Sequence, residues 1–319
     1  MSSPILKLIA QRVALGVVLL LAVSVLIFVG TQILPGDVAQ QILGQSATPE
    51  SLANLREQLG LNDPAYVRYF HWLGGVLTGN LGTALTSGLD ISTAIKERLA
   101  NTLFLAGCAA VVAIPLAIVL GLLAVRYRNG WIDKTISAVA LASTSFPEFF
   151  IGYVLVFVFA VKIQLFPGIS TVYPGMGFGE RLQAVVLPAA ALTIVVLAHM
   201  MRMTRAAILN VMQSAYIETA ELKGLSPFTI IWRHAFPNAI APIINVVMLN
   251  LAYLVVGVVV VEIIFVYPGM GQYLVDHVTK RDVPVVQAVG LIFAAVYISL
   301  NIIADIAGIL SNPRLRHPK

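Results

Sequence analysis

A few ionisable side chains interrupt otherwise apolar stretches of this sequence, and their chemistry needs explaining first. Glu148 lies near the middle of Thr135–Val161, which contains no other charge, and it directly follows Pro147. A charge at the centre of a membrane helix costs about 2.5–3.5 kcal/mol on insertion scales, so such a residue is a functional candidate by default. Glu148 could meet a cationic amine of a substrate. The alternative is a carboxyl that is neutral or bonded to backbone groups that Pro147 frees.

Other polar residues near or within apolar stretches have both a functional and a structural interpretation. Asn245, Asn250 and Tyr253 share one stretch, where they could bond a peptide backbone or simply a neighbouring helix. For Glu262 and Asp305, each near the end of a stretch, structural hydrogen bonding is the favoured interpretation. The candidates for a substrate pathway are Glu148, Asn245, Asn250, Tyr253 and Glu262.

The sequence lacks the motifs of ATP binding and of common hydrolytic catalysis. It contains no G-x4-G-K-[ST], no H-E-x-x-H and no G-x-S-x-G. His199 has no second ligand nearby in sequence, and the single Cys108 excludes an internal disulfide framework and a cysteine-based zinc site. We therefore expect no catalytic residue, no metal site and no cofactor bound by this chain, and any energy from ATP must come from a partner.

The composition indicates which elements position these residues. Hydrophobic residues make up 59% of the chain, charged residues only 11%, and mean hydropathy is +0.90, whereas soluble domains are about half apolar and one quarter charged. Six stretches exceed the roughly 18 residues that predict a membrane-spanning helix, so we expect an all-α integral membrane protein with six transmembrane helices. The stretches are Val13–Leu34, Leu99–Val125, Thr135–Val161, Leu182–Met201, Ala235–Val261 and Val283–Ala304.

The distribution of lysine and arginine predicts the orientation in the membrane. Twelve lie at the two termini and in the two connections on the same side, four lie in the short connections on the other side, and four lie in the long segment 35–98. Long segments translocate largely regardless of charge, so both termini are expected to be cytoplasmic. The net charge of +5 is then a topology signal, and we expect no nucleic-acid partner. At the cytoplasmic end of the fourth stretch, we expect His199, Arg202 and Arg205 to orient the helix and contact lipid headgroups, with gate lining as the alternative.

Three regions follow from this topology. Residues 1–34 form an N-terminal segment with an uncleaved first span, because the apolar run exceeds a signal-peptide core of about 7–15 residues and no small-x-small cleavage site follows. Residues 35–98 form an external helical region, with helices predicted from Thr48 to Gly60 and over Tyr66–Leu77. That region is either a lid packed on the spans, which we favour, or a docking surface for an external partner. Residues 99–319 form the core membrane domain.

A polar segment between the fourth and fifth spans predicts a cytoplasmic helix–turn–helix. Helix-forming residues run from Tyr216 to Gly224, which can take the left-handed conformation that ends a helix. Ser226 as the cap and Pro227 at the first helical position predict a second helix over Phe228–Phe236. Such a motif can read DNA, but between two membrane spans it is more plausibly a docking element for another protein.

This segment, residues 206–238, resembles the EAA loop of ABC importer permeases. The pattern of that loop is E-A-A-x3-G-x9-I-x-L-P, and the spacing is the same here. Arg233-His234-Ala235 is similar to the dipeptide, oligopeptide and nickel branch of the family. The positions that match the general pattern are Glu218, Ala220, Gly224 and Pro237, and those that depart from it are Thr219, His234 and Phe236.

An ordered series of shorter motifs resembles the first of the two permease subunits in that branch and extends along nearly the whole chain. The family more often has Asp where Asn80 stands here. The motifs are Leu34-Pro-Gly-Asp37, Leu55-Arg-x3-Gly60-Leu61, Gly79-Asn-Leu-Gly82, Lys223-Gly-Leu225, Val261-Glu262, Pro268-Gly-Met-Gly271, Arg281-Asp282-x-Pro284-x-x-Gln287 and Asn312-Pro-Arg314.

The resemblance implies a type I ABC importer permease fold in a bacterial cytoplasmic (inner) membrane. It also implies three kinds of protein partner besides the lipid bilayer: a second homologous permease subunit, two ABC ATPase subunits that bind the ATP and magnesium, and an external solute-binding protein. The residues implied in coupling to the ATPases are Tyr216, Glu218, Thr219, Ala220, Gly224, Leu225, Ser226, Arg233, His234 and Pro237.

The function implied is uptake of dipeptides or oligopeptides, with nickel chelates, glutathione, opines or oligosaccharides as alternative substrates. An integral membrane enzyme and an ATP-independent transporter are the alternatives from other classes. The enzyme lacks a recognisable nucleophile–base pair, and the transporter would not need the EAA spacing.

The pentapeptide Tyr-Pro-Gly-Met-Gly occurs at Tyr173–Gly177 and at Tyr267–Gly271. The sequences that flank the two copies do not extend the match, so a duplicated fold is not indicated. Both copies are predicted to follow a span at the outer face, where Tyr anchors at the interface and Pro-Gly turns the chain. Only the second copy belongs to the family pattern.

Overall fold

The computed structural model describes residues 3–33, 38–58, 60–173 and 175–311. These residues are almost entirely helical, and the only β-type pairing among them is an isolated bridge between Thr83 and Asp90. The motif residues 34–37 and 312–314, and Pro174 of the first pentapeptide, lie outside the described residues. The helices are α1 (Ser3–Ile33), α2 (Val38–Leu43), η1 (Gly44–Ser46), α3 (Pro49–Gln58), α4 (Ala65–Leu77), α5 (Ile91–Arg126), α6 (Trp131–Ser145), α7 (Glu148–Leu155), η2 (Val156–Lys162), α8 (Phe178–Ala184), α9 (Val186–Met212), α10 (Ala215–Leu222), α11 (Pro227–Thr229), η3 (Ile230–Ala235), α12 (Phe236–Ile264), α13 (Met270–Thr279) and α14 (Val283–Ser311).

Five helical segments are long and apolar enough to cross a membrane, and a bent pair of helices makes a sixth crossing if it is counted as one span. The predicted all-α membrane fold is therefore confirmed. The bent pair is α6 with α7 and η2, which meet at 101°. The predicted third span is therefore not one straight helix. The opening expected at Pro147 is a sharp bend, because Phe146 precedes the proline and adopts extended angles (φ −90°, ψ 137°). Glu148 consequently stands at the start of α7 rather than in the middle of a helix.

The chain divides into two compact units. Unit 1 comprises residues 1–16, 103–267 and 296–319, and unit 2 comprises residues 17–102 and 268–295. The membrane-based division at residues 34 and 98 is a different kind of boundary and stays a prediction.

In unit 2, the amphipathic helix α4 packs on α1, as a lid packed on a span requires. The ring of Tyr69 lies edge-on to Phe28 with centroids 5.4 Å apart, and its hydroxyl is 2.8 Å from Ser24 Oγ. Trp72 also lies against Phe28, with centroids 6.2 Å apart. The predicted helix over Tyr66–Leu77 is confirmed by α4.

Polar side chains fasten the turns of unit 2. Thr93 donates from its backbone N–H and its hydroxyl to Asp90 at 2.8 Å, which caps the start of α5 and holds the pKa of Asp90 below its usual value. The Thr86 backbone N–H and hydroxyl donate to the buried Asp282 at 2.9 and 2.8 Å. Gln287 donates to the Thr31 hydroxyl at 2.7 Å, so this family-pattern glutamine joins α14 to α1.

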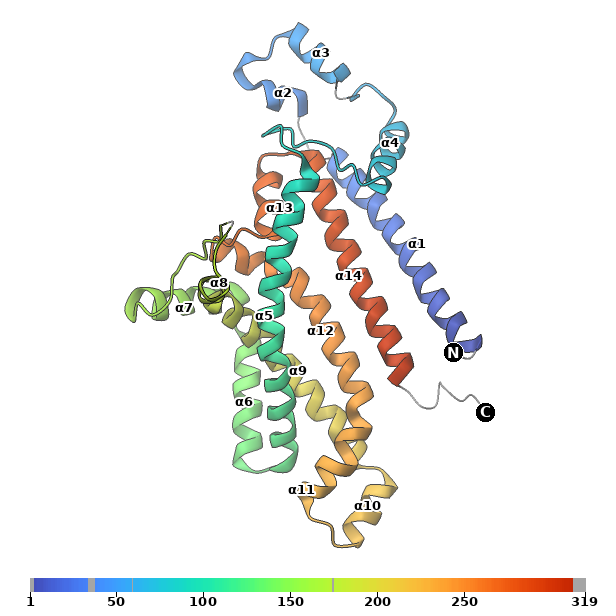
Figure 1. Ribbon diagram of the computed structural model, residues 1–319, viewed down its shortest axis with the longest axis vertical. Coiled ribbons are helices and arrows are strands. Elements are labelled where there is room, and N and C mark those ends of the chain that lie inside the picture. The colour runs from blue at the N-terminus through green and yellow to red at the C-terminus, as the bar shows by residue number, and fades with distance from the viewer. Residues whose placement is uncertain (1–2, 34–37, 59, 174, 312–319) are drawn as a thin grey trace. The chain divides into compact units, whose positions relative to one another are not determined.

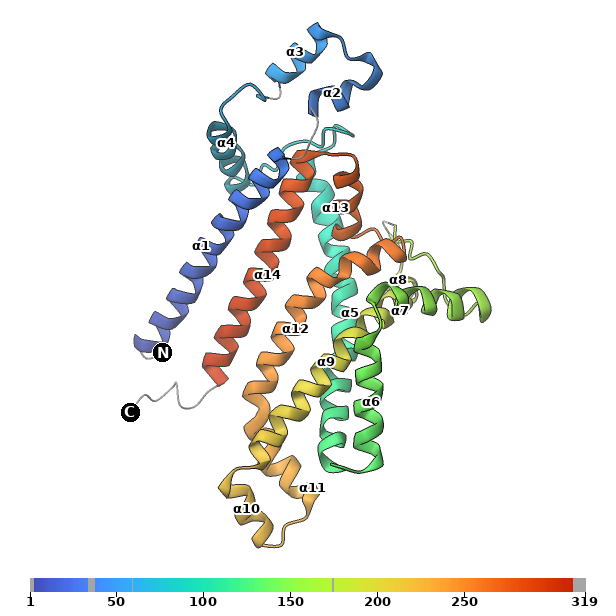
Figure 2. The same ribbon diagram turned by 180° about the vertical axis from the view of Figure 1, so that it is seen from behind.

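In unit 1, α9 and α12 cross and pack along much of their lengths, with α6 and α7 also packed on α9 (Figures 1 and 2). The Ser170 N–H donates to the Phe265 carbonyl at 2.8 Å, and its hydroxyl donates to the Ala184 carbonyl at 2.7 Å. Ser170 is fully buried. The segments that lead into the two pentapeptides therefore meet at one end of α12, as the predicted topology requires.

Candidate functional site

The short helix α10 carries the first half of the predicted coupling loop. Ser214 precedes it in an extended conformation, and α10 ends where Gly224 takes a φ of +75°. The Gly224 N–H reaches the Glu221 carbonyl at 2.9 Å and the Leu225 N–H reaches the Ala220 carbonyl at 3.3 Å. The predicted left-handed exit at Gly224 is confirmed, and the reason for glycine is conformational, since a Cβ there would meet nothing within 4 Å.

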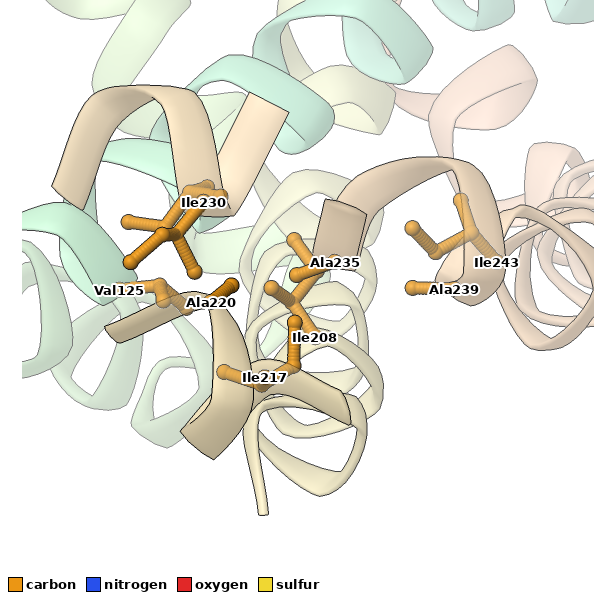
Figure 3. Packing of buried hydrophobic residues seen from close by; sticks show 9 residues of the cluster. Val125, Ile208, Ile217, Ala220, Ile230, Ala235, Ala239 and Ile243 are labelled. Atoms are coloured by element: carbon orange, nitrogen blue, oxygen red, sulfur yellow. The ribbon is translucent and has the colours of Figure 1, made fainter. Parts of the chain in front are cut away.

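Part of the predicted coupling loop packs against the ends of neighbouring helices (Figure 3). Ile217 (1% exposed) and Ala220 (6% exposed) of α10 are the two residues of that helix that lie in a buried apolar cluster. Ile208 of α9 lies beside Ile217 in that cluster. The cluster, here called the anchor cluster, consists of Val125, Ile208, Ile217, Ala220, Ile230, Ile231, Ala235, Ala239 and Ile243.

The same segment also carries several apolar side chains that are exposed. Leu222 is 83% exposed, Phe228 65% and Trp232 55%. The Trp232 ring stacks on Phe236 with centroids 5.4 Å apart. Exposed aliphatic and aromatic side chains of this size are typical of interaction surfaces. Of the predicted coupling residues, Ala220 is buried and His234 is partly exposed, whereas the exposed ones are Tyr216, Glu218, Thr219, Gly224, Leu225, Ser226, Arg233 and Pro237.

The second half of the loop begins as the sequence predicts but does not end where it predicts. Ser226 caps α11 by accepting from the Thr229 N–H at 3.2 Å, and Pro227 stands in the first turn. The helix then continues through the π-helical turn η3 into α12, so residues from Pro227 to Ile264 form one helical segment. Sequence reasoning missed this continuity.

Three of the predicted pathway residues have side chains that are not fully buried within the chain. Glu148 begins α7, which packs on α9 and α12, and its Oε1 is buried without a hydrogen-bond partner among the described residues. Glu148 lies within electrostatic range of Tyr253 on α12, a residue that is half exposed. Asn245 lies against Gly308 of α14. A Cβ built on Gly308 would lie 2.5 Å from the side-chain amide oxygen of Asn245.

The other two predicted pathway residues are buried. Asn250 is 6% exposed and donates from its amide to the Val246 carbonyl at 2.7 Å within its own helix. Glu262 is fully buried at the end of α12, close to Tyr267. The Asn250 contact is of the structural kind that the sequence left open, and structural hydrogen bonding remains the favoured interpretation for Glu262. Asp305 forms an ion pair with Arg12 at 3.1 Å, which agrees with its structural interpretation.

One charged pair was missed in the sequence. Arg205 of α9 donates to both carboxylate oxygens of Asp133 on α6, at 2.9 and 2.8 Å. The Arg205 side chain stays 27% exposed while it pairs with Asp133, so contact with lipid headgroups remains a prediction for Arg205. The available signal was an acid just before the third apolar stretch and a base just after the fourth. Among the described residues, no group of three or more His, Cys, Asp or Glu could hold a metal ion.

Comparison with known proteins gives the family. Residues 113–317 match the binding-protein-dependent transport system inner membrane component family, and residues 5–105 match the N-terminal family of such membrane components. The probable peptide ABC transporter permease protein y4tP of Sinorhizobium fredii is 32% identical over 97% of this chain and 99% of its own length. A putative peptide transport system permease protein of Brucella abortus is 35% identical, again over 97% and 99%.

The glutathione transport system permease protein GsiC of Salmonella typhimurium is also similar, with 34% identity over 93% of this chain and 95% of its own length. These matches cover the membrane spans, the segment 206–238 and the family motifs together. The chain therefore belongs to the family of binding-protein-dependent transport system inner membrane components, and it is a multi-pass membrane permease of an ABC importer.

Proposed function

We propose that this chain forms one half of the pathway through which an ABC importer takes up short peptides. The similarity to peptide permeases along 97% of the chain is the observation that carries this substrate class. Glutathione, a tripeptide with one γ-linkage, is the second candidate, because a glutathione permease is similar at 34% identity.

The coupling role rests on the two faces of the segment 206–238. Its buried face fixes α10 and η3 on the anchor cluster, while Tyr216, Leu222 and Phe228 present an exposed apolar surface. Two partner ATPases would cover that surface on this chain and on a second, homologous permease. ATP and magnesium would bind to those ATPases, which would hydrolyse the ATP, and this chain would contribute no catalytic group and hold no cofactor.

The membrane orientation follows from the same assignment. The segment 206–238 faces the ATPases, so both termini lie in the cytoplasm and residues 35–98 face the solute-binding protein outside. Reporter fusions to each terminus and to the external region test this arrangement. A terminus that is accessible from outside intact cells would contradict it.

Glu148, Tyr253 and Asn245 are the strongest pathway residues. Glu148 has a carboxylate oxygen without a protein partner among the described residues, and it could accept a hydrogen bond from the amino group of a peptide. Asn250 and Glu262 have the contacts given above and are weaker candidates. Glu148→Gln should raise the peptide concentration for half-maximal uptake, whereas a variant with unchanged uptake would remove Glu148 from the pathway.

Uptake in proteoliposomes tests the function as a whole. The chain is reconstituted with its permease partner, its ATPases and the cognate binding protein, and uptake of tritiated trialanine and of labelled glutathione is compared with and without Mg-ATP. ATP-dependent trialanine uptake is expected, with Gly224→Trp as the uncoupled control that inserts but does not transport. Uptake of glutathione without uptake of trialanine would make glutathione the substrate in place of ordinary short peptides. Uptake without any ATPase would refute the importer assignment.

A further inference from the structure

The partly buried ion pair between Asp133 and Arg205 has a geometry that fixes orientation as well as distance. Arg205 presents Nε and Nη2 to the two oxygens of one carboxylate, at 2.9 and 2.8 Å. The Asn129 N–H, in the turn between α5 and α6, donates to the same carboxylate at 3.0 Å. Paired hydrogen bonds from a planar guanidinium define the angle between the two groups, which a single bond or apolar packing does not.

The turn of α9 that carries Arg205 is also the place where that helix meets α5. A Cβ built on Gly121 of α5 would lie 2.9 Å from the Thr204 side chain and 3.4 Å from the Arg205 backbone nitrogen. Such close approach leaves no room for the two helices to slide past each other without a change of packing. Arg205 therefore lies where α9 contacts both helices that flank the turn at residues 127–130.

One turn further along α9, Ile208 enters the anchor cluster. Ile208 is fully buried there with Ile217 and Ala220 of α10 and with Val125 at the end of α5 (Figure 3). The end of α9 is thus held by α10 on one side and by α5 and α6 on the other. The contact with α10 is apolar. The contact with α6 includes the paired hydrogen bonds between Arg205 and Asp133, here called the fork.

We propose that the Asp133–Arg205 pair makes the α5–α6 turn move together with the coupling segment, so that it positions two spans each time the ATPases displace α10. This inference rests on the proposed coupling role of the segment 206–238. Arg205 acts here as a positioning residue, and it touches neither the substrate nor the ATPase. Without the fork, the apolar contacts still hold α9 near α6 but allow the two helices to rotate relative to each other.

A distance measurement between the two ends of this connection tests the proposal directly. Spin labels are attached at Arg128→Cys in the α5–α6 turn and at Gln213→Cys after α9, both exposed positions, in a Cys108→Ser background. The complete complex is measured by pulsed electron paramagnetic resonance without nucleotide and with Mg-ATP and vanadate. The native pair should give the same narrow distance in both states.

The variants separate the fork from the charge. Asp133→Asn removes the charge with little change of shape, and Arg205→Lys keeps the charge but loses the fork. In both, we expect a distance that broadens and differs between nucleotide states, and a ratio of trialanine uptake to ATP hydrolysed that falls at least about fivefold. Exchanging the two charges in one chain (Asp133→Arg with Arg205→Asp) should recover the narrow distance at least in part.

Arg202→Gln is the matched control, because Arg202 is exposed on the same helix and should leave the distance and the ratio unchanged. Distances in Asp133→Asn that match the native protein in both states would overturn the inference. Loss of ATPase co-purification in both single variants would also overturn it, since the pair would then serve folding alone. Normal transport by Gly224→Trp would instead refute the proposed coupling function, and this result does not depend on the Asp133–Arg205 pair.

Discussion

Replacing Ile217 with alanine tests whether the coupling helix depends on its buried face. Ile217 is 1% exposed and lies in the anchor cluster beside Ile208 of α9 (Figure 3). The helix α10 has only eight residues, and isolated helices shorter than about 12–15 residues are marginal in water. Packing of Ile217 and Ala220 must therefore supply most of the free energy that keeps α10 folded.

The expected magnitude follows from the burial. Truncating a buried isoleucine to alanine costs about 2–5 kcal/mol, and truncating it to valine costs about 0.5–1.5 kcal/mol. Because 1.4 kcal/mol corresponds to a factor of ten, Ile217→Ala should increase local opening of α10 by about 30-fold or more. Ile217→Val should increase it by about two- to tenfold.

Amide hydrogen exchange of residues 215–222 measures this opening in the permease subunits in lipid nanodiscs without the ATPases, whose recovery is measured separately. Leu222→Ala is the matched control, since Leu222 lies on the same helix but is 83% exposed. It should leave the exchange of α10 unchanged while reducing the recovery of the ATPase subunits. Ile217→Ala should raise the exchange and lower uptake per ATP, although the membrane spans stay folded.

Two results would refute this reasoning. Unchanged exchange of α10 in Ile217→Ala would mean that the anchor cluster does not hold the helix. Faster exchange in Leu222→Ala than in Ile217→Ala would mean that the assignment of buried and exposed faces is inverted. Either outcome would remove the structural basis for a coupling helix fixed on the spans.

Three further substitutions give separate tests. Gly224→Ala should destabilise the exit from α10 by about 1–2 kcal/mol, because the φ of Gly224 is +75° while a Cβ there meets no atom within 4 Å. Gly224→Asn should cost less, since Asn tolerates the left-handed conformation better. Equal destabilisation by Ala and Asn would contradict a conformational cause. Gly121→Ala should cost about 1–3 kcal/mol and lower the thermal unfolding midpoint, with partial recovery on adding Thr204→Ser, because the new Cβ would meet Thr204 Cγ2 at 2.9 Å. Arg12→Gln should change the free energy of unfolding by at most about 1 kcal/mol, since the side chains of Arg12 and Asp305 are 51% and 43% exposed; a larger loss that persists in 1 M salt would show that the pair is not screened.

The sequence was sufficient for features that one or two residues decide locally. Gly224 in a left-handed conformation, Ser226 as a helix cap and Pro227 in the first turn all appear as expected, because each depends on backbone conformation alone. The apolar stretches also located the spans, since no other structure buries so many consecutive apolar residues with so few charges.

The sequence was insufficient where a long-range partner or a single bend decides the result. Hydropathy is continuous through Phe146 and Glu148, so a window of apolar residues does not register the 101° turn that Pro147 allows. Asp133 and Arg205 are 72 positions apart. The sequence around each residue does not predict its partner. Only the packing of α6 on α9 brings the two charges together.

The helix that begins at Pro227 continues into α12, and a proline in the sequence explains how. Pro237 has no N–H, so the regular bond to the carbonyl four residues earlier cannot form. The backbone accommodates this by the π-helical turn η3, in which the Phe236 N–H reaches the Ile231 carbonyl. The Asn238 side chain then donates to the His234 carbonyl at 2.7 Å.

Two hydrophobic residues explain why the helix does not separate from its neighbours at this point. Ala235 and Ala239 are fully buried in the anchor cluster, whereas the polar Arg233 lies on the exposed side. The polar residues that suggested a break between two helices are therefore one face of a single amphipathic segment. Because that segment runs without interruption from Pro227 to Ile264, a displacement at its Pro227 end must move or bend α12 itself. The second half of the predicted coupling loop is therefore continuous with a membrane span. No flexible linker separates the predicted ATPase surface from the helix that carries Asn245 and Tyr253.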